Sequence, residues 1–534
     1  MNTPSRTSSW GGQLLAFSGL DGATSFDHGL AARTSLDLAG LEIRLPERAR
    51  LVFPNPVSVN LAGDHFTWTL PAGNVRGVFL DAFHLLIEGP CVVERLDEGL
   101  SKVERGGKLL VGATPRFDAD LISSEMEQAI SARSRWLAEK SCPPHLSPSA
   151  QRTLAKVLSV MKSQVCTPEG RIAHRWTTPD RWPHRRMWLW DSVFHAVGWR
   201  HLDVALARDM ISAVFDAQRA DGFIPHMMDP HQVSPMTQPP VLALGVALVL
   251  EKEPCPEWLD EVYPKLCAYL RWDMANRDSD GGGLLEWDIE GDPNCRSGES
   301  GMDNSPRFDS ATRLDAVDFN SFLAHECELL AEFARQLDRP ADAAEWVGQA
   351  ARTNALIREK LWSPAHRFFV DDDVERGHPS DILASSGFMP LLSGAATPEQ
   401  AAALVAHLHN PTTFGTAFPI PSVAACHADR YVKDMWRGPS WINMNWLTAR
   451  GLDRYGYRAE AEALRARTKA EIERWCESHG SLFEFYDDRG EVPPPLLMRK
   501  GKCAPQEHPI HQVFHDYGWT CTLYADLVLG AHAL

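Results

Sequence analysis

The feature that most constrains this chain is the spacing of its helical segments, which begin near residue 147. Apolar residues recur there with the helical period, and polar loops rich in Gly and Pro separate the periodic stretches. Several stretches begin at candidate capping residues, among them Ser149, Asp203 and Ser380. We expect twelve helices, over 147–165, 191–201, 203–219, 238–252, 257–276, 314–337, 341–361, 380–393, 397–407, 440–456, 458–475 and 516–532.

The connectors between these helices alternate in length. Short ones lie near residues 202, 339 and 457, and they would close helical hairpins at one end of the fold. Loops longer than about 15 residues are uncommon unless they are functional. The long connectors, which would gather at the opposite end and build a cleft, are 166–190, 277–313, 408–439 and 476–515. Six hairpins in this arrangement predict a mainly α fold, an (α/α)6 toroid with its active site in the loops.

Residues 1–140 have a different pattern, in which short apolar runs are broken by turns. The run from His65 to Leu70 alternates with period two, as a half-buried strand does. We interpret this region as a smaller antiparallel β-sandwich-like domain with a linker helix near 124–140. The run Ser-Cys-Pro-Pro at 141–144 predicts the boundary, so that the domains are 1–140 and 141–534.

Charge and cysteine content exclude several classes of function. Acidic residues outnumber basic ones by 70 to 53, which argues against a broad nucleic-acid surface. The densest basic spots, 181–186 and 499–502, are interpreted as solvated loops. No apolar run reaches the roughly 18 residues of a membrane helix, and no secretory signal is visible at the N-terminus. Eleven scattered Cys without a C-x-x-C pair indicate reduced thiols and give no zinc site. We expect a cytoplasmic protein without metal or cofactor, and a homo-oligomer remains an open option.

Two loops carry isolated carboxylates. In the first, Gly301 allows a sharp turn before Asp303, and the alternative is that Asp303 or Glu299 caps the following helix. In the second, Glu484 stands in an aromatic strand-like run, where burial between Phe residues is costly unless the carboxylate is paired or functional. The alternative for Glu484 is an edge strand on which it faces water.

Three further segments place indoles beside polar groups. They are the Trp-Asp pair at Trp190 and Asp191, the run Trp-Arg-Gly-Pro-Ser-Trp-Ile-Asn that begins at Trp436, and a Gly-Trp-Thr run at 518–520. Asp191 is equally suited to cap a helix. The chain has 18 Trp against 8 Tyr, and sugar rings pack on aromatic faces. Together the segments are typical of a sugar pocket.

These five segments, in this order, resemble glycoside hydrolase family 63 and its clan relatives, which include trehalases and mannosylglycerate hydrolases. The resemblance covers the helical domain and not the first 140 residues. It implies an (α/α)6 barrel and an inverting, exo-acting hydrolase of α-glycosides. By motif match Asp303 is the general acid and Glu484 the general base, with Glu491 as the nearest competitor of Glu484.

The segments and the resemblance together also predict which residues bind the substrate. These are Trp190, Asp191, His226, Gln238, Gly301, Arg307, Trp436, Arg437, Trp441, Asn443, Tyr486 and Trp519.

Inverting hydrolysis sets physical requirements on the two carboxyl groups. They must stand roughly 6.5–9.5 Å apart to leave room for the attacking water, against about 5–5.5 Å in a retaining enzyme. Asp303 must be protonated, so we expect burial or a nearby carboxylate to raise its pKa. We expect Arg437 to pair with a carboxylate, with Glu484 as the candidate.

The leading function is hydrolysis of a small α-glucoside. The alternative substrate is a mannosyl- or glucosylglycerate, whose anionic aglycone needs a cation at the mouth of the pocket. Candidate cations are Arg185, Arg186, Arg437, Arg499 and Lys502. Two alternatives of another class are a sugar phosphorylase, which would dispense with the carboxylate base, and a non-catalytic sugar-binding toroid.

Overall fold

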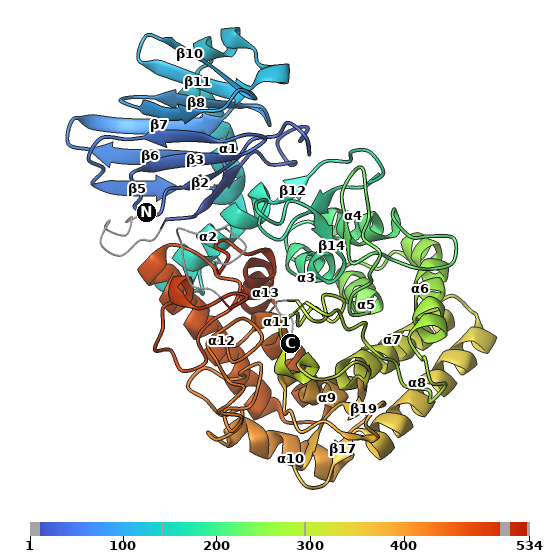
Figure 1. Cartoon of the computed structure of the whole chain (residues 1–534). Coiled ribbons are helices and arrows are strands. Elements are labelled where there is room, and N and C mark those ends of the chain that lie inside the picture. The colour runs from blue at the N-terminus through green and yellow to red at the C-terminus, as the bar shows by residue number, and fades with distance from the viewer. Residues whose placement is uncertain (1–10, 141–142, 293–294, 502–512, 531–534) are drawn as a thin grey trace.

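The computed structural model of the chain describes residues 11–140, 143–292, 295–501 and 513–530. Figure 1 shows a β-rich region at one end of the molecule and the helices gathered beneath it. The predicted boundary at 141–144 lies partly outside the described residues. None of the described helices is both long enough and apolar enough to cross a bilayer.

The β-rich region consists of two antiparallel sheets. The strands of the first, in spatial order, are β1 (Leu14–Ala16), β2 (Ala31–Thr34), β3 (Gly40–Leu45), β4 (Ala49–Val52) and β9 (Val92–Leu96). Those of the second are β10 (Leu100–Arg105), β11 (Lys108–Ala113), β8 (His84–Glu88), β7 (Gly73–Phe79), β6 (His65–Leu70) and β5 (Ser58–Leu61). The strand predicted from His65 to Leu70 is confirmed as β6.

The two sheets pack face to face around an apolar core. Leu41 and Leu51 of the first sheet share this core with Phe66 and Trp68 of the second, because alternate residues of each strand point inward. The outer face of the second sheet is covered by α1 (Met126–Lys140), whose Met126 packs with residues of β7, β8 and β11.

Helices fill the rest of the chain. They are α2 (Pro148–Ser163), α3 (Leu189–Trp199), α4 (Val204–Phe215), α5 (Leu242–Lys252), α6 (Pro256–Asn276), α7 (Val317–Gln336), α8 (Pro340–Lys360), α9 (Met389–Ser393), α10 (Pro398–His409), α11 (Ile442–Arg454), α12 (Arg458–His479) and α13 (Gly518–Leu529). The connectors hold short strands: β12 (Val165–Cys166), β13 (Trp176–Thr177), β14 (Met187–Trp188), β15 (Met227–Met228), β16 (Leu314–Asp315), β17 (Trp362–Ser363), β18 (Phe368–Phe369), β19 (Asp372–Asp373) and β20 (His378–Pro379).

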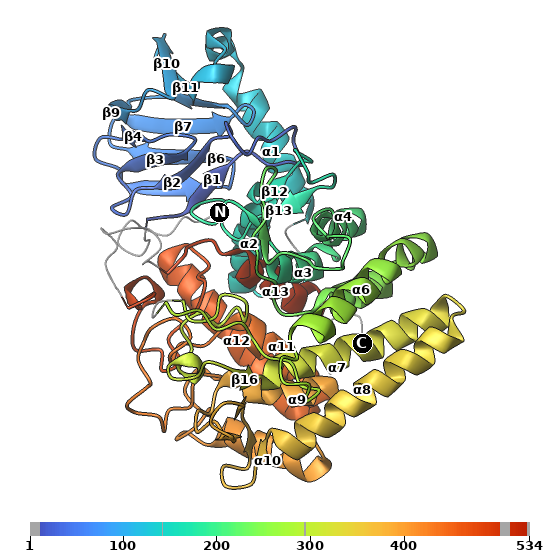
Figure 2. The same cartoon turned by 45° about the vertical axis from the view of Figure 1, so that its right-hand side comes forward.

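The helices contact one another in a closed cycle. α3 contacts α5, and the series continues through α7, α9, α11 and α13 back to α3. Other helices pack outside this cycle, as α2 does on α13, α4 on α3, α8 on α7 and α12 on α11. Figure 2 shows α7 and α8 side by side along their length.

One predicted helix is largely wrong. The range 380–393 contains only a 3-10 turn (Ser385–Phe388) and the short α9, and Ser380 caps no helix. Residues before the turn are extended instead, because Leu383 and Ser385 exchange backbone hydrogen bonds with residues 422–424. Of the other predicted caps, Asp203 is confirmed, whereas Ser147 rather than Ser149 caps α2.

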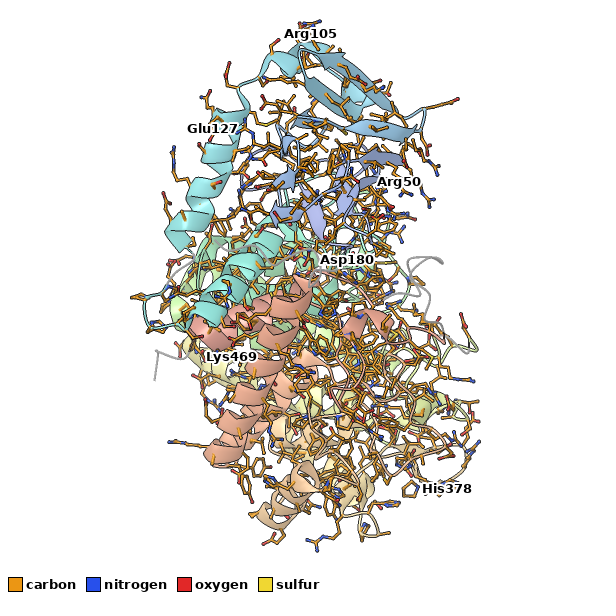
Figure 3. All side chains as sticks on the ribbon, turned by 90° about the vertical axis from the view of Figure 1, so that its left-hand side faces the viewer. Arg50, Arg105, Glu127, Asp180, His378 and Lys469 are labelled. Atoms are coloured by element: carbon orange, nitrogen blue, oxygen red, sulfur yellow. The ribbon has the colours of Figure 1, made fainter. Side chains whose placement is uncertain are left out.

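Buried polar contacts join the β-rich region to the helices. Arg33 of β2 donates to the carbonyl oxygens of Gly12 (2.7 Å), Asp180 (2.9 Å), Trp182 (2.6 Å) and His515 (3.0 Å). Figure 3 shows Asp180 at the junction of the two regions. A buried cation with this many partners fixes the loops around residues 180 and 515 against the sandwich.

We predict that Arg33→Leu lowers the free energy of unfolding by about 3 kcal/mol, because several buried carbonyls lose their donor. Urea denaturation measures this change. Arg48→Leu, at an exposed turn between β3 and β4, is the matched control and should shift stability by less than about 0.5 kcal/mol. Equal midpoints for the two variants would contradict the assigned role of Arg33.

Candidate functional site

The long connectors that carry the singled-out motifs are tied together. The backbone N–H of Trp436 donates to the Asn304 side chain (3.0 Å), which joins the connector 410–441 to the connector 277–316. The N–H of Gly518 donates to the Pro179 carbonyl (2.7 Å), which joins α13 to the connector before α3. Segments far apart in sequence therefore form one site.

Asp303 stands in a turn built against an indole. Gly301 has φ +70°, and a Cβ there would lie 2.4 Å from the Trp190 ring. The turn therefore requires glycine both for its backbone conformation and for its close contact with the indole. Glu299 is fully buried, with Arg277 at 2.7 Å, and it caps no helix. The following 3-10 turn (Pro306–Phe308) receives no side-chain cap, so Asp303 does not cap it either.

Lys500 forms an ion pair with Asp303, at 3.1 Å between Nζ and Oδ2. The Asp303 side chain keeps 20% of its surface exposed, so solvent can reach it. Burial alone would raise the pKa of Asp303, but Lys500 and Arg499 outweigh it and hold that pKa below its usual value. The expectation of a raised pKa for Asp303 is therefore wrong in this structure, because the sequence alone did not show that two cations lie beside this carboxylate.

Glu484 is buried and held by Arg499. The guanidinium donates to both carboxylate oxygens, at 2.9 and 3.2 Å, and lies over the Phe514 ring at 4.2 Å. Such a two-pronged contact fixes the orientation of the carboxylate. The alternative in which Glu484 faces water is wrong, because its side chain is only 2% exposed.

Two expectations about the partners of Glu484 are corrected. Arg437 does not pair with it, because both of its terminal nitrogens contact Asp309 at 2.7 Å. Glu491 is 64% exposed and pairs with Lys433, so it lies outside the buried carboxylate pair.

Consecutive residues thus hold the two carboxylates. Arg499 and Lys500 contact Glu484 and Asp303, and the charge of Arg499 also acts on Asp303, which shows that both carboxylates share one site. The prediction of a solvated basic loop at 499–502 is wrong at these positions. Lys502, a candidate cation, lies outside the described residues. The sequence did not single out Lys500, and Arg499 was named only as a candidate cation for an anionic aglycone; the available signal was a basic pair directly after Met498.

Asp191 lies beneath this pair in the first turn of α3. It does not cap the helix, because the cap position is Trp188. Complete burial, together with the nearby charges of Glu484 and Asp180, raises its pKa well above the ordinary value, whereas a hydrogen bond with Tyr517 acts in the opposite direction. Asp191, close to the Glu484 carboxylate, therefore holds a proton more readily than an ordinary aspartic acid. Tyr517 is a site residue that the sequence did not single out.

Four of the predicted indoles form one cluster. Trp436 and Trp441 stack at 3.8 Å with an interplanar angle of 2°, and Trp519 meets Trp441 at 5.7 Å and Trp190 at 5.3 Å. The Nε1 atoms of Trp436 and Trp519 have no hydrogen-bond partner among the described residues. The four rings are buried, at 1–3% exposed, so they form a packed aromatic cluster in which two indole donors lack a protein partner among the described residues.

The other predicted binding residues differ in their availability. Burial lowers the pKa of His226 to about 4, and the negative charge of Asp303 only partly offsets this effect. The imidazole of His226 is therefore neutral at ordinary pH. The side-chain oxygen of Gln238 accepts a hydrogen bond from the backbone N–H of Trp190 at 3.2 Å and thereby orients that residue. The buried Asn443 amide has no partner within the described chain.

Arg307 and Tyr486 are already engaged by protein groups. Arg307 is fully buried and pairs with Asp318 at 2.7 Å and Asp371 at 3.0 Å. The Tyr486 hydroxyl accepts the Phe483 N–H at 3.1 Å within the core. These contacts suit positioning roles better than contact with a ligand. Within the described segments, no three His, Cys, Asp or Glu side chains are arranged to hold a metal ion.

Comparison with known proteins gives one family. Residues 183–520 match the family described as the mannosylglycerate hydrolase MGH1-like glycoside hydrolase domain. A mannosylglycerate hydrolase of Thermus thermophilus is 28% identical over 58% of this chain and 91% of its own length. A glucosylglycerate hydrolase of Mycolicibacterium hassiacum is 24% identical over 58% of this chain and 87% of its own.

Solved structures agree with this match. A family 63 mannosylglycerate hydrolase of Thermus thermophilus, in complex with Tris and D-glycerate, superposes with a TM-score of 0.56 at 25% identity. The alignment covers 70% of this chain and 99% of that one.

We predict that Gly301→Ala lowers kcat/KM about 100-fold, because the new Cβ clashes with Trp190 and displaces Asp303. Gly281→Ala is the matched control: it lies in the same connector with φ +74° and open space around its Cβ. Both variants bear the left-handed backbone penalty, about 1 kcal/mol, but only the first should lose activity. Equal values of kcat/KM for the two variants would mean that the turn at Gly301 does not position Asp303.

Proposed function

Because the chain belongs to the MGH1-like glycoside hydrolases of family 63, we propose that it hydrolyses the α-glycosidic bond of a mannosyl- or glucosylglycerate. The observation that carries this proposal is the pair of carboxylates, Asp303 and Glu484, held in one site by the consecutive cations Lys500 and Arg499. A site for a neutral glucoside has no need of a cation beside the leaving group. The relatives named for glycosylglycerates favour this substrate over the small α-glucoside first expected.

In the proposed mechanism Asp303 donates a proton to the departing glycosidic oxygen. Glu484 takes a proton from the water that attacks the opposite face of the sugar, and the configuration inverts. The bidentate contact with Arg499 holds the Glu484 carboxylate in one orientation. Asp191 and the indole cluster would bind the sugar ring, with hydroxyls bonded to the Asp191 oxygen and the indole N–H groups that lack a partner among the described residues.

The same proposal includes the architecture. The closed helix cycle supports an (α/α)6 toroid, with the β-sandwich of residues 1–140 as a separate domain packed on it.

Phosphorolysis is the competing reaction. It is disfavoured because a phosphate would have to approach the water side of the site, where Glu484 already occupies Arg499.

A proton NMR time course tests the reaction on a panel of α-glucosides, α-mannosides and both glycosylglycerates, with and without phosphate. We expect a glycosylglycerate to be cleaved, the β sugar to appear first, and phosphate to change nothing. Cleavage of neutral glycosides only would overturn the substrate, and initial release of the α sugar would overturn inversion.

We predict that Asp303→Asn and Glu484→Gln each lower kcat by about 10³-fold or more, because each removes one proton-transfer group. A glycosyl fluoride should restore much of the rate of Asp303→Asn, since fluoride leaves without a proton. Glu491→Gln is the control and should keep full activity, because that carboxylate is exposed. Full activity of Asp303→Asn on an unactivated glycoside would remove Asp303 from the role of acid.

A further inference from the structure

The ion pair between Lys500 and Asp303 poses a chemical problem for a general acid. A lysine at 3.1 Å stabilises the carboxylate, whereas the reaction requires the carboxylic acid. The pair also lies at the place where a leaving group would sit, because an acid must touch the glycosidic oxygen. Something in the complex has to separate Lys500 from Asp303.

The backbone around Lys500 is firmly held, so the separation falls to its flexible side chain. The N–H of Gly501 donates to the Asp434 carboxylate at 2.7 Å, and the N–H of Met498 donates to the Lys433 carbonyl at 2.9 Å. The Lys500 side chain is 13% exposed, and the Asp303 side chain that it contacts is 20% exposed, so solvent reaches both. Its four-carbon stem can turn without movement of the chain.

The aglycone itself carries a suitable anion. In a 2-O-glycosylglycerate the carboxyl carbon is bonded to the carbon that bears the glycosidic oxygen. A cation in contact with the carboxyl group that protonates this oxygen is therefore within reach of the aglycone carboxylate. Oppositely charged groups at such a distance attract strongly in a site with little water.

We propose that Lys500 is the residue that recognises the aglycone carboxylate, and that on binding it leaves Asp303 for this carboxylate. The inference rests on the proposed function and adds to it a role for the substrate. By drawing Lys500 away, an anionic aglycone allows Asp303 to take up the proton that it must donate. A neutral aglycone leaves Lys500 paired with Asp303. The ion pair therefore favours substrates with a glycerate aglycone over those with a neutral one.

The groups around Asp303 define the expected pH dependence. Lys500 and Arg499 lower its pKa, Cys295 hydrogen-bonds to it, and His226 is neutral. Since the acid must be protonated, kcat/KM falls as pH rises through the pKa of Asp303 in the free protein. Loss of Lys500 raises that pKa, so the alkaline fall moves to higher pH.

The first test compares a glycosylglycerate with the 2-O-glycosylglycerol of the same sugar, in which a hydroxymethyl group replaces the carboxylate. Lys500→Met should lower kcat/KM for the glycerate roughly 10- to 100-fold, the range expected for loss of a charged hydrogen bond. For the glycosylglycerol, Lys500→Met should not lower kcat/KM. The pH at which kcat/KM begins to fall should instead move to a higher value. Lys500→Arg should retain most of the preference for glycerate.

Lys265→Met is the matched control, because it removes a lysine from an exposed ion pair with Glu261 on α6 and should change neither substrate. Equal losses on both substrates with Lys500→Met, without a shift in pH dependence, would show that Lys500 is merely structural and would overturn the proposal.

The second test does not depend on turnover. Calorimetry of D-glycerate binding, in two buffers of different ionisation enthalpy and without Tris, measures protons taken up. The wild-type protein should take up a proton near pH 6, and Asp303→Asn should bind glycerate without uptake. Binding without uptake in the wild type would overturn the transfer of Lys500 while the proposed function stands. Absence of both glycerate binding and glycosylglycerate cleavage would overturn the function and this inference together.

Discussion

The site depends on two cations that are neighbours in the chain and serve two carboxylates brought from distant connectors. Arg499 holds Glu484, and Lys500 holds Asp303. Without them, three acidic groups would share a poorly hydrated space, and burial would raise the pKa of Asp303. Because the cations are consecutive, a shift of their segment disturbs the contacts of both carboxylates at once. Its anchors on residues 433–435 are thus as important as the contacts themselves.

The two cations differ in chemistry as well as in position. A guanidinium bound through two nitrogens is a fixed partner, which suits the role of general base proposed for Glu484. An ammonium on a flexible stem is an exchangeable partner, which suits an acid that must gain and lose a proton. The positions of Arg and Lys in this pair therefore match the opposite needs of Glu484 and Asp303.

Most of the helices and the principal β pattern were predictable, because periodicity is a local signal. The range 380–393 failed because backbone pairing with residues 422–424 is not local. Asp303 and Glu484 were found from their motifs, but the partner of each was not. Arg437 was assigned to Glu484, yet tertiary packing places it on Asp309. Which carboxylate a cation reaches depends on the fold, and Arg499 and Lys500 carried no periodic signal of their own.

Arg33 has a consequence for the way the molecule can be divided. Its guanidinium satisfies carbonyls on both sides of the junction between the sandwich and the helices, at Gly12 on one side and at Asp180, Trp182 and His515 on the other. The last of these is two residues from Tyr517, which hydrogen-bonds to Asp191. The two large hydrophobic cores, one in the sandwich and one among the helices, are therefore joined by buried polar contacts. A cut drawn where the sequence changes character would remove the Arg33 donor and open to water peptide groups that are now packed in the junction, so the sandwich stabilises the helical region and is not a detachable module.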